Sequence, residues 1–271
     1  MSEVPVSIRR TRRSLVQAAM RRLGDGDGSF ALSRLNDLIV DTDDIRDLEA
    51  AILKLAISSK LSKAEPSDGT GQELLDDLKA ARPKPKRAAK SSSGHPISSG
   101  IDVVPDHWAL APLGDIAEIV MGQSPPGETY NTGGEGLPLI NGPAEFGPGW
   151  LDKPVAVQYT TKPTKLCQAG DLLICVRGAT TGRTNVAGEQ ACIGRGVAAI
   201  RSRTSQRYVD YFVLALRQDI LDSGRGSTFP SVSRDDLLAI VATVPPAKEQ
   251  QRIVGVVDSL LETTKRLKAA V

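Results

Sequence analysis

The stretch Thr243-Val244-Pro245-Pro246 marks where one structural unit ends and another begins. Val244 precedes a proline, which biases it toward extended geometry, and neither proline can continue a strand in the interior of a sheet. Pro246 suits the first turn of a helix, where a backbone N–H has no partner within the helix, and Glu249 complements the helix dipole there. We therefore predict a strand that ends at Val244 and a helix over 246–271.

The predicted C-terminal helix carries a narrow apolar seam. Its members recur at alternating spacings of four and three, and they are Ile253, Val257, Leu260, Thr264 and Leu267. A seam of this kind is typical of a coiled coil, whereas a helix that lies on a globular core has a broader apolar stripe. The pattern favours a helical partner, and the alternative is an ordinary amphipathic helix packed on its own domain.

A second seam lies near the N-terminus, within a region over 1–81 that we predict to be helical. Asp43 or Asp44 can cap a helix whose apolar residues repeat at heptad spacing, namely Ile45, Leu48, Ile52 and Leu55. The two seam helices could pair through these residues and those of the C-terminal helix. The fold class that we expect is therefore mixed α/β, with one domain of short strands and helices beside an antiparallel coiled-coil spacer.

The stretch 82–102 is rich in proline, lysine, serine and glycine and has few apolar side chains. Such a composition buries too little surface to offset the entropy cost of ordering, so we predict a flexible basic linker. The region 103–245 follows, with short apolar strands at Leu137–Ile140, Asp171–Val176 and Val197–Arg201 and a helix over Tyr208–Leu221. Its glycine-rich loops are the natural place for recognition.

Composition narrows the class of protein. No apolar run approaches the roughly 20 residues that span a bilayer, and the arginine-rich N-terminus lacks the apolar stretch of a secretory signal. Three cysteines, an odd number in apolar or glycine-flanked stretches, suggest buried thiols and a cytoplasmic protein. The net charge is only +2, but arginines and lysines are clustered, and a cluster can attract a polyanion or simply form a solvated face.

The sequence contains two stretches that are similar to catalytic or nucleotide-binding motifs, but neither matches its motif completely. The stretch 178–184 follows a predicted strand as a phosphate-binding loop does, but it is one residue short and has Arg183 in place of the lysine. Ser124-Pro125-Pro126 is similar to an amino-methyltransferase motif, but Gly127 replaces the aromatic residue that stacks on a flipped base. The two histidines, His95 and His107, offer no metal-binding spacing. We predict a chain without catalytic or metal-binding residues.

Several blocks in order resemble the specificity (S) subunit of type I restriction-modification systems. They comprise Leu113-Gly114-Asp115-Ile116 to Gly122-Gln123-Ser124-Pro125, Gly170-Asp171-Leu172-Leu173 to Arg177-Gly178, Cys192-Ile193-Gly194-Arg195-Gly196, Gly226-Ser227-Thr228-Phe229-Pro230 with Asp236-Leu237, and Pro245-Pro246 to Arg252-Ile253-Val254. Together they are similar to one complete target recognition domain that runs into the family's spacer helix.

The resemblance implies a non-catalytic DNA-reading subunit. Its partners would be double-stranded DNA, adenine methyltransferase (M) subunits that use S-adenosylmethionine, and in a full system a restriction and translocation (R) subunit that uses ATP and Mg²⁺. Family members carry two recognition domains separated by two long antiparallel helices. This chain has one such domain and places a spacer-like segment, 48–61, before it, which suggests a half-size form of which two copies complete one another's spacer and read an inverted, bipartite target.

Candidate DNA-contacting residues lie on the loops of the predicted recognition domain. They are Gln123, Ser124, Arg177, Thr180, Thr181, Arg183, Asn185, Arg195, Arg225, Ser227, Thr228 and Ser231. Arginine can read guanine, glutamine or asparagine can read adenine, and cations and hydroxyls can hold phosphate. The alternative is that Arg195 between two glycines, and the stretch 227–229, are turns that the fold needs.

Two other functions remain open at this point. The first is a protein-interaction adaptor in a phage-defence complex that keeps the fold without reading sequence. The second is a divergent methyltransferase that uses the stretch from Ser124 to Gly127.

Overall fold

The computed structural model describes residues 42–81, 101, 104–223 and 231–270. The chain divides into two compact units, one of Met1–Gly69 with Ala247–Val271 and one of Thr70–Pro246. Within the described residues, no helix combines the length and the apolar character needed to cross a membrane.

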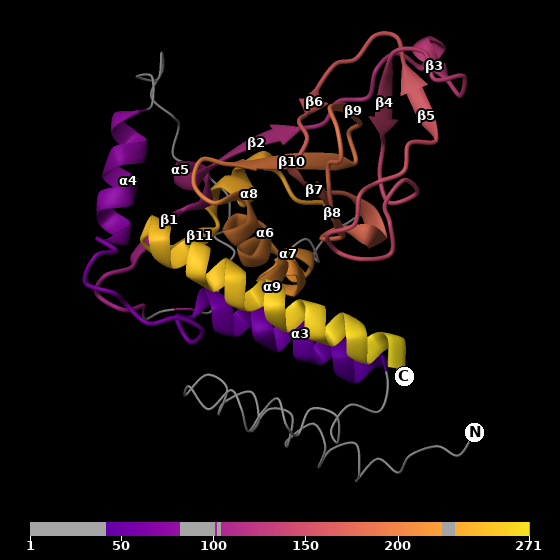
Figure 1. The fold of residues 1–271 in the computed structure, drawn as a ribbon. Helices are drawn as coiled ribbons and strands as arrows, with labels where there is room; N and C mark the ends of the chain where they lie inside the picture. Colours follow the sequence, from indigo (N-terminus) through magenta and orange to yellow (C-terminus); the bar gives the residue numbers. More distant parts are fainter. Residues whose placement is uncertain (1–41, 82–100, 102–103, 224–230, 271) are drawn as a thin grey trace. The chain divides into compact units, whose positions relative to one another are not determined.

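The first unit is built on two helices, α3 (Thr42–Ile57) and α9 (Ala247–Ala270), which lie side by side (Figure 1). They run antiparallel, because Ser62, beyond the end of α3, donates to Glu249 near the start of α9 (2.6 Å), while Thr264 donates to Glu49 (3.2 Å). The predicted seam residues that are buried are Ile45, Leu48, Ile52, Ile253, Val257 and Thr264, and those half-buried are Leu55, Leu260 and Leu267. The two helices therefore pair within one chain.

An arginine on α9 fastens the loop that follows α3. The guanidinium of Arg252 donates to both carboxylate oxygens of Asp68 and to the carbonyl of Lys63. The Asp68 side chain is 1% exposed, and the hydrogen bond from Arg252 lowers its pKa to about 2. Asp68 is therefore ionised at neutral pH and stays paired with Arg252.

The described residues of the second unit form three sheets. Strands β1 (Ala109–Pro112) and β11 (Val241–Val244) form an antiparallel pair. A four-stranded sheet has the order β2 (Ala117–Met121), β10 (Val197–Ser202), β7 (Leu172–Cys175) and β8 (Thr184–Val186). A five-stranded sheet has the order β3 (Tyr130–Asn131), β5 (Gln158–Thr160), β4 (Leu137–Ile140), β9 (Ala191–Ile193) and β6 (Leu166–Cys167).

Helices in this unit are short. They are α4 (Gly71–Ala80), α5 (Leu113–Ile116), α6 (Gln206–Ala215), α7 (Arg217–Ser223) and α8 (Arg234–Ala239), together with the 3₁₀ turns η1 (Gly127–Thr129) and η2 (Gly178–Thr180). The predicted helix over 208–221 is thus two helices, which meet at Leu216. The predicted strand that ends at Val244 is confirmed, and the helix that follows it begins at Ala247.

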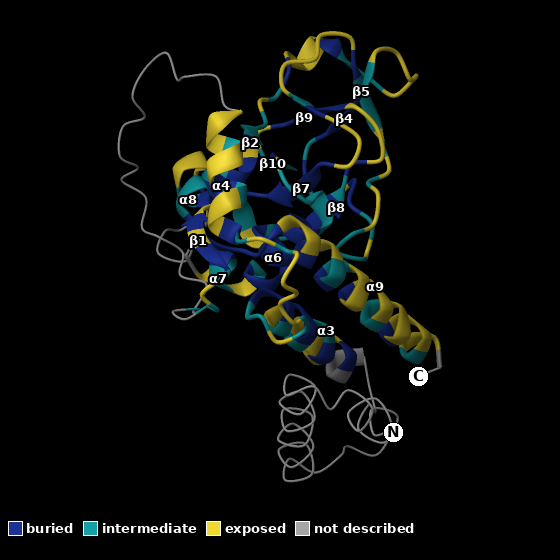
Figure 2. Cartoon of the chain, turned by 60° about the vertical axis from the view of Figure 1, so that its left-hand side comes forward, coloured by how far each residue is buried: buried dark blue, intermediate teal, exposed yellow. Residues whose placement is uncertain are grey.

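The core of the second unit lies between its two larger sheets. Leu173 and Cys175 of β7, and Val197 and Ala199 of β10, pack in one apolar cluster with residues of β4, β6 and β9. The alternate residues of the same strands are also fully buried, and α6 contacts β10. Figure 2 shows the central strands and α6 as buried. Burial on both faces explains why these strands are continuous apolar runs.

The helix α4 belongs to the second unit, which differs from our assignment of 1–81 to one helical region. Thr70 caps it in a capping box with Glu73, and the N–H of Gly71 donates to the carbonyl of His107 (2.8 Å). This contact joins residues that lie on either side of the predicted linker. A capped amphipathic helix does not show in its own sequence which unit it packs against, so the boundary could not be placed from local pattern.

Candidate nucleic-acid interface

The ends of several strands converge at one edge of the two larger sheets. Strands β2 and β7 both pair antiparallel with β10, so both end where β10 begins, and the parallel pair β4 and β9 ends nearby. Backbone hydrogen bonds tie these ends together: the N–H of Gly122 donates to Val197 (2.9 Å), and the N–H of Gly194 donates to Ile140 (2.9 Å). The loops that follow four different strands are therefore held side by side.

These loops enclose a groove of about 740 Å³. The residues that line it are Ser124, Asn141, Arg177, Gly178, Arg195, Gly196 and Ser231. Four of them are candidates from the sequence, and they come from four separate loops. Arg177 and Arg195 are exposed, and among the lining residues that the structure describes none is acidic. A concave surface with two cations and no anion attracts negatively charged ligands.

Backbone contacts fix the rim of the groove. The N–H of Arg195 donates to the hydroxyl of Ser124 (3.4 Å), which joins the loops after β2 and β9. Arg177 and Ser231 form an isolated antiparallel bridge, and the N–H of Val232 donates to Val176 (2.9 Å). The side chains of the two arginines thus project from anchored backbone, which reduces the entropy lost when they bind a ligand.

Two other candidates, Arg183 and Asn185, lie apart from the groove residues. The Arg183 guanidinium donates to the carbonyls of Phe146 (3.3 Å) and Gly147 (3.2 Å). Asn185 is fully buried, accepts from the N–H of Gly147 (2.7 Å) and donates to the carbonyl of Gly149 (2.8 Å). Both side chains satisfy the backbone of one irregular loop, which has no ladder partners of its own.

The remaining candidates differ in their surroundings. Gln123 is exposed next to Ser124, and its carbonyl accepts a hydrogen bond from Thr164. Thr181 is buried and donates to the carbonyl of Gly178 (2.7 Å), while Thr180 is half-buried beside Cys175. Arg225, Ser227 and Thr228 lie outside the described residues, as does Phe229. Trp108 and Leu113, which precede the first of these loops, are buried in the core.

Asn141 lines the groove but is absent from the candidates chosen by sequence. It directly follows the buried strand β4, whose brief apolar run is visible in the sequence. The sequence signal that could have identified Asn141 is a polar residue that directly follows a buried strand. Our candidates were confined to arginine-rich and glycine-rich loops, so this position was missed.

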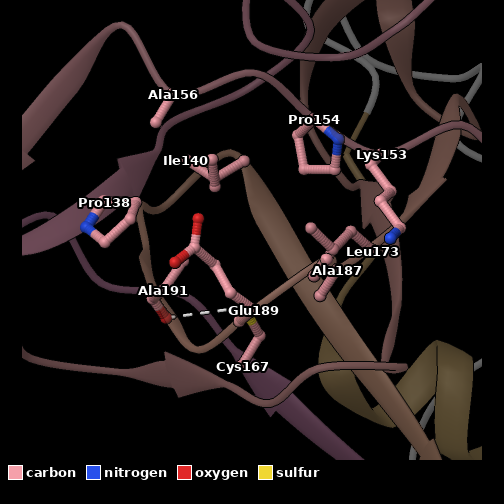
Figure 3. Close-up of a pocket in the computed structure, with 11 residues that line it drawn as sticks. Pro138, Ile140, Lys153, Pro154, Ala156, Cys167, Leu173, Ala187, Glu189 and Ala191 are labelled. Carbon is pink, nitrogen blue, oxygen red and sulfur yellow. Dashed lines mark hydrogen bonds between the residues drawn. The ribbon is translucent and has the colours of Figure 1, made fainter.

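A second, smaller cavity of about 210 Å³ lies beside Cys167 and is shown in Figure 3. It is smaller than the roughly 300–1,000 Å³ of most small-molecule sites. Burial raises the pKa of Cys167 to about 11, and that of Cys175 also to about 11, so both thiols are protonated at neutral pH. All three cysteines are free and buried, which confirms that they are structural thiols.

The structure also tests the similarity of the stretch 178–184 to a phosphate-binding loop. The stretch 178–184 joins the antiparallel strands β7 and β8, whereas a phosphate-binding loop leads from a strand into a helix. Over the ranges that the structure describes, no group of three or more His, Cys, Asp or Glu side chains is arranged to hold a metal ion.

Comparisons with known proteins find a matching family and several similar chains. The family model described as the type I restriction modification DNA specificity domain matches residues 105–271. The putative type I restriction enzyme MjaX specificity subunit of Methanocaldococcus jannaschii is 37% identical over 178 residues, which are 63% of this chain and 41% of that protein.

Two solved structures are similar over nearly the whole chain. The HsdS subunit from Thermoanaerobacter tengcongensis aligns with a TM-score of 0.55 and 28% identity, over 98% of this chain and 53% of that one. A chain from work on complex assembly and conformational transition of the type I R-M system aligns with a TM-score of 0.56 and 29% identity, over 98% and 55%. The chain thus spans about half the length of these solved relatives, and less than half of the curated one.

Proposed function

The chain belongs to the family of type I restriction modification DNA specificity domains, and on this premise we propose that it recognises a DNA sequence on behalf of a restriction-modification complex. The observation that carries the proposal is the groove lined by Ser124, Asn141, Arg177, Arg195 and Ser231. It combines cations with hydroxyl and amide groups on anchored loops, which are the groups that contact phosphates and base edges.

Within this proposal the groove residues divide by chemistry. Arg177 and Arg195, both exposed, bind phosphate oxygens or guanine, and the hydroxyls of Ser124 and Ser231 add phosphate contacts. Arg183 and Asn185 act indirectly, because their polar groups hold the loop from Phe146 to Gly149. Their substitution would change the shape of the recognition surface without removing a contact to DNA.

The chain itself performs no chemistry in this proposal. A base that is to be methylated must leave the duplex, and the pocket that receives it belongs to an adenine methyltransferase subunit with its S-adenosylmethionine. A restriction and translocation subunit with ATP and Mg²⁺ completes the system where it is present. The role of this chain is to place those enzymes at one DNA sequence.

We further propose that two copies of the chain act together. The solved relatives are about twice as long as the aligned region, and this chain contributes one recognition domain. Because α3 and α9 already pair within a chain, the second copy would supply a second recognition domain together with its own helix pair. Two-fold symmetry then predicts a target with inverted halves.

The test is selection of bound duplexes from a randomised DNA pool by the full chain together with its methyltransferase. We expect enrichment of a bipartite sequence, and methylation at that sequence in the host genome that disappears when the gene is deleted. Assembly with the methyltransferase without any sequence enrichment would contradict DNA reading and support the adaptor function instead.

A further inference from the structure

Asn141 occupies a distinctive position in the groove, because it is the only amide among the described residues that line it. It follows β4, whose residues Leu139 and Ile140 are fully buried, so its backbone is anchored on the N-terminal side. On the other side, the N–H of Gly142 donates to the buried Glu145 carboxylate (3.0 Å). Asn141 is therefore anchored by a buried strand on one side and by a local turn on the other.

Asn141 also packs closely against the loop that follows β9. Its Oδ1 lies against Gly194, where an added Cβ would come within 2.2 Å of that oxygen, and its carbonyl lies against Gly196, where the distance would be 2.7 Å. Only glycine at these positions permits so close an approach. The amide therefore lies against the loop that carries Arg195, with no space for a side chain at either glycine.

The hydrogen-bonding capacity of this amide is nevertheless little used. Its one hydrogen bond among the described residues is a long one, from Nδ2 to Oε1 of Gln158 (3.4 Å), and both side chains are half-buried. In the described part of the chain, no buried polar side-chain atom lacks a partner, so the Oδ1 of Asn141, which accepts no hydrogen bond there, is not fully enclosed by protein. A pre-positioned donor and acceptor at a half-exposed site can exchange water for a ligand at small entropic cost.

We propose that Asn141 is a specificity-determining residue that reads an adenine, an inference that rests on the function proposed above. The two arginines in the groove offer only donors, which suits phosphate or guanine. The Asn141 amide offers one donor and one acceptor side by side, which matches the N6 amino group and N7 of adenine in the major groove. Gln158 orients this amide from the adjacent strand β5.

The experiment compares variants of the full chain, each with the methyltransferase, in selection from a randomised duplex pool. In Asn141→Ala we expect one adenine position of the selected sequence to lose roughly 5- to 150-fold of its discrimination, while the other positions keep theirs. In Asn141→Asp the donor becomes an acceptor, so the same position should shift toward cytosine, whose N4 group donates. Gln190→Ala, which removes an exposed amide outside the groove, is the matched control.

Three results would overturn the inference, and they are distinguishable. An unchanged sequence preference in both Asn141 variants would show that the amide reads no base. Equal weakening on every sequence would show that Asn141 only supports the loop; thermal unfolding of each variant shows whether the fold itself has changed. Absence of any selected sequence with the wild-type chain would instead defeat the proposed function itself.

Discussion

The arginines of the second unit differ in what surrounds their side chains. Arg195 and Arg177 project from the rim of the groove, whereas Arg183 donates to backbone carbonyls of a single loop. We expect Arg177→Ala and Arg195→Ala each to weaken DNA binding and to reduce the slope of log affinity against log salt by about one. Arg183→Ala should lower the melting temperature and leave that slope unchanged, because no phosphate contact is lost.

Titration of binding by fluorescence anisotropy between about 50 and 200 mM salt measures these slopes. Lys162→Ala serves as a control, because it removes one exposed cation that does not line the groove. A reduced slope for Arg183→Ala together with unchanged slopes for the two groove arginines would reverse the assignment.

A buried carboxyl makes stability depend on pH. Burial raises the pKa of Asp210 to about 7, and the hydrogen bond from Gln206 (2.8 Å) offsets this only in part. The folded chain therefore binds a proton that the unfolded chain releases near pH 4, so this carboxyl reduces stability as pH rises from about 4 to about 7. In Asp210→Asn we expect a melting temperature that falls less over this window.

Differential scanning calorimetry at about pH 5 and about pH 8 provides the measurement, since 1 kcal/mol corresponds to roughly 2–4 °C in a chain of this size. Glu135→Gln, at an exposed carboxylate, should follow the wild type. Parallel pH profiles of Asp210→Asn and wild type would contradict a raised pKa.

At the scale of elements, the sheet edge that carries the groove depends on how closely the ends of its strands approach one another. A Cβ at Gly122 would lie 2.1 Å from the carbonyl oxygen of Gly194 and 2.6 Å from that of Val197, and both are backbone atoms that cannot turn aside. We expect Gly122→Ala to destabilise the chain by about 1–3 kcal/mol and to weaken DNA binding, because the loops after β2 and β9 are forced apart.

Denaturant unfolding measures the first effect and anisotropy the second. Gly127→Ala is the matched control, since a Cβ there meets no atom within 4 Å and its backbone is not left-handed. If both alanine variants unfolded at the same denaturant concentration as wild type, close packing at this edge would not be a source of stability.

At the scale of the whole molecule, the proposed function ties the number of copies to the kind of DNA target. One recognition domain reads one segment of DNA, and a bipartite target needs two. We expect light scattering to give a mass of two copies for the complex of this chain with its methyltransferase on DNA. The selected DNA should then contain inverted half-sites. A complex with one copy on each DNA site would rule out the paired arrangement.

Much of the architecture follows from local pattern. The apolar runs at 137–140, 172–175 and 197–200 form strands because burial on both faces requires continuous apolar side chains. The prolines at 245 and 246 separate β11 from α9 through constraints on single residues. The order of the sequence blocks between Leu113 and Val254 was also sufficient to identify the family, and the match over residues 105–271 bears this out. Each of these conclusions depends on residue types and their order along the chain, without knowledge of which segments meet in space.

The groove was decided by tertiary structure alone. Ser124, Asn141, Arg177, Arg195 and Ser231 are spread over more than one hundred positions of the sequence and meet only because strand pairing brings their loops to one edge. Asn185 and Arg195 are both polar residues on loops, yet one is buried against backbone and the other is exposed. Side-chain chemistry determines what a residue is able to bind, but long-range pairing determines which residues face the same ligand.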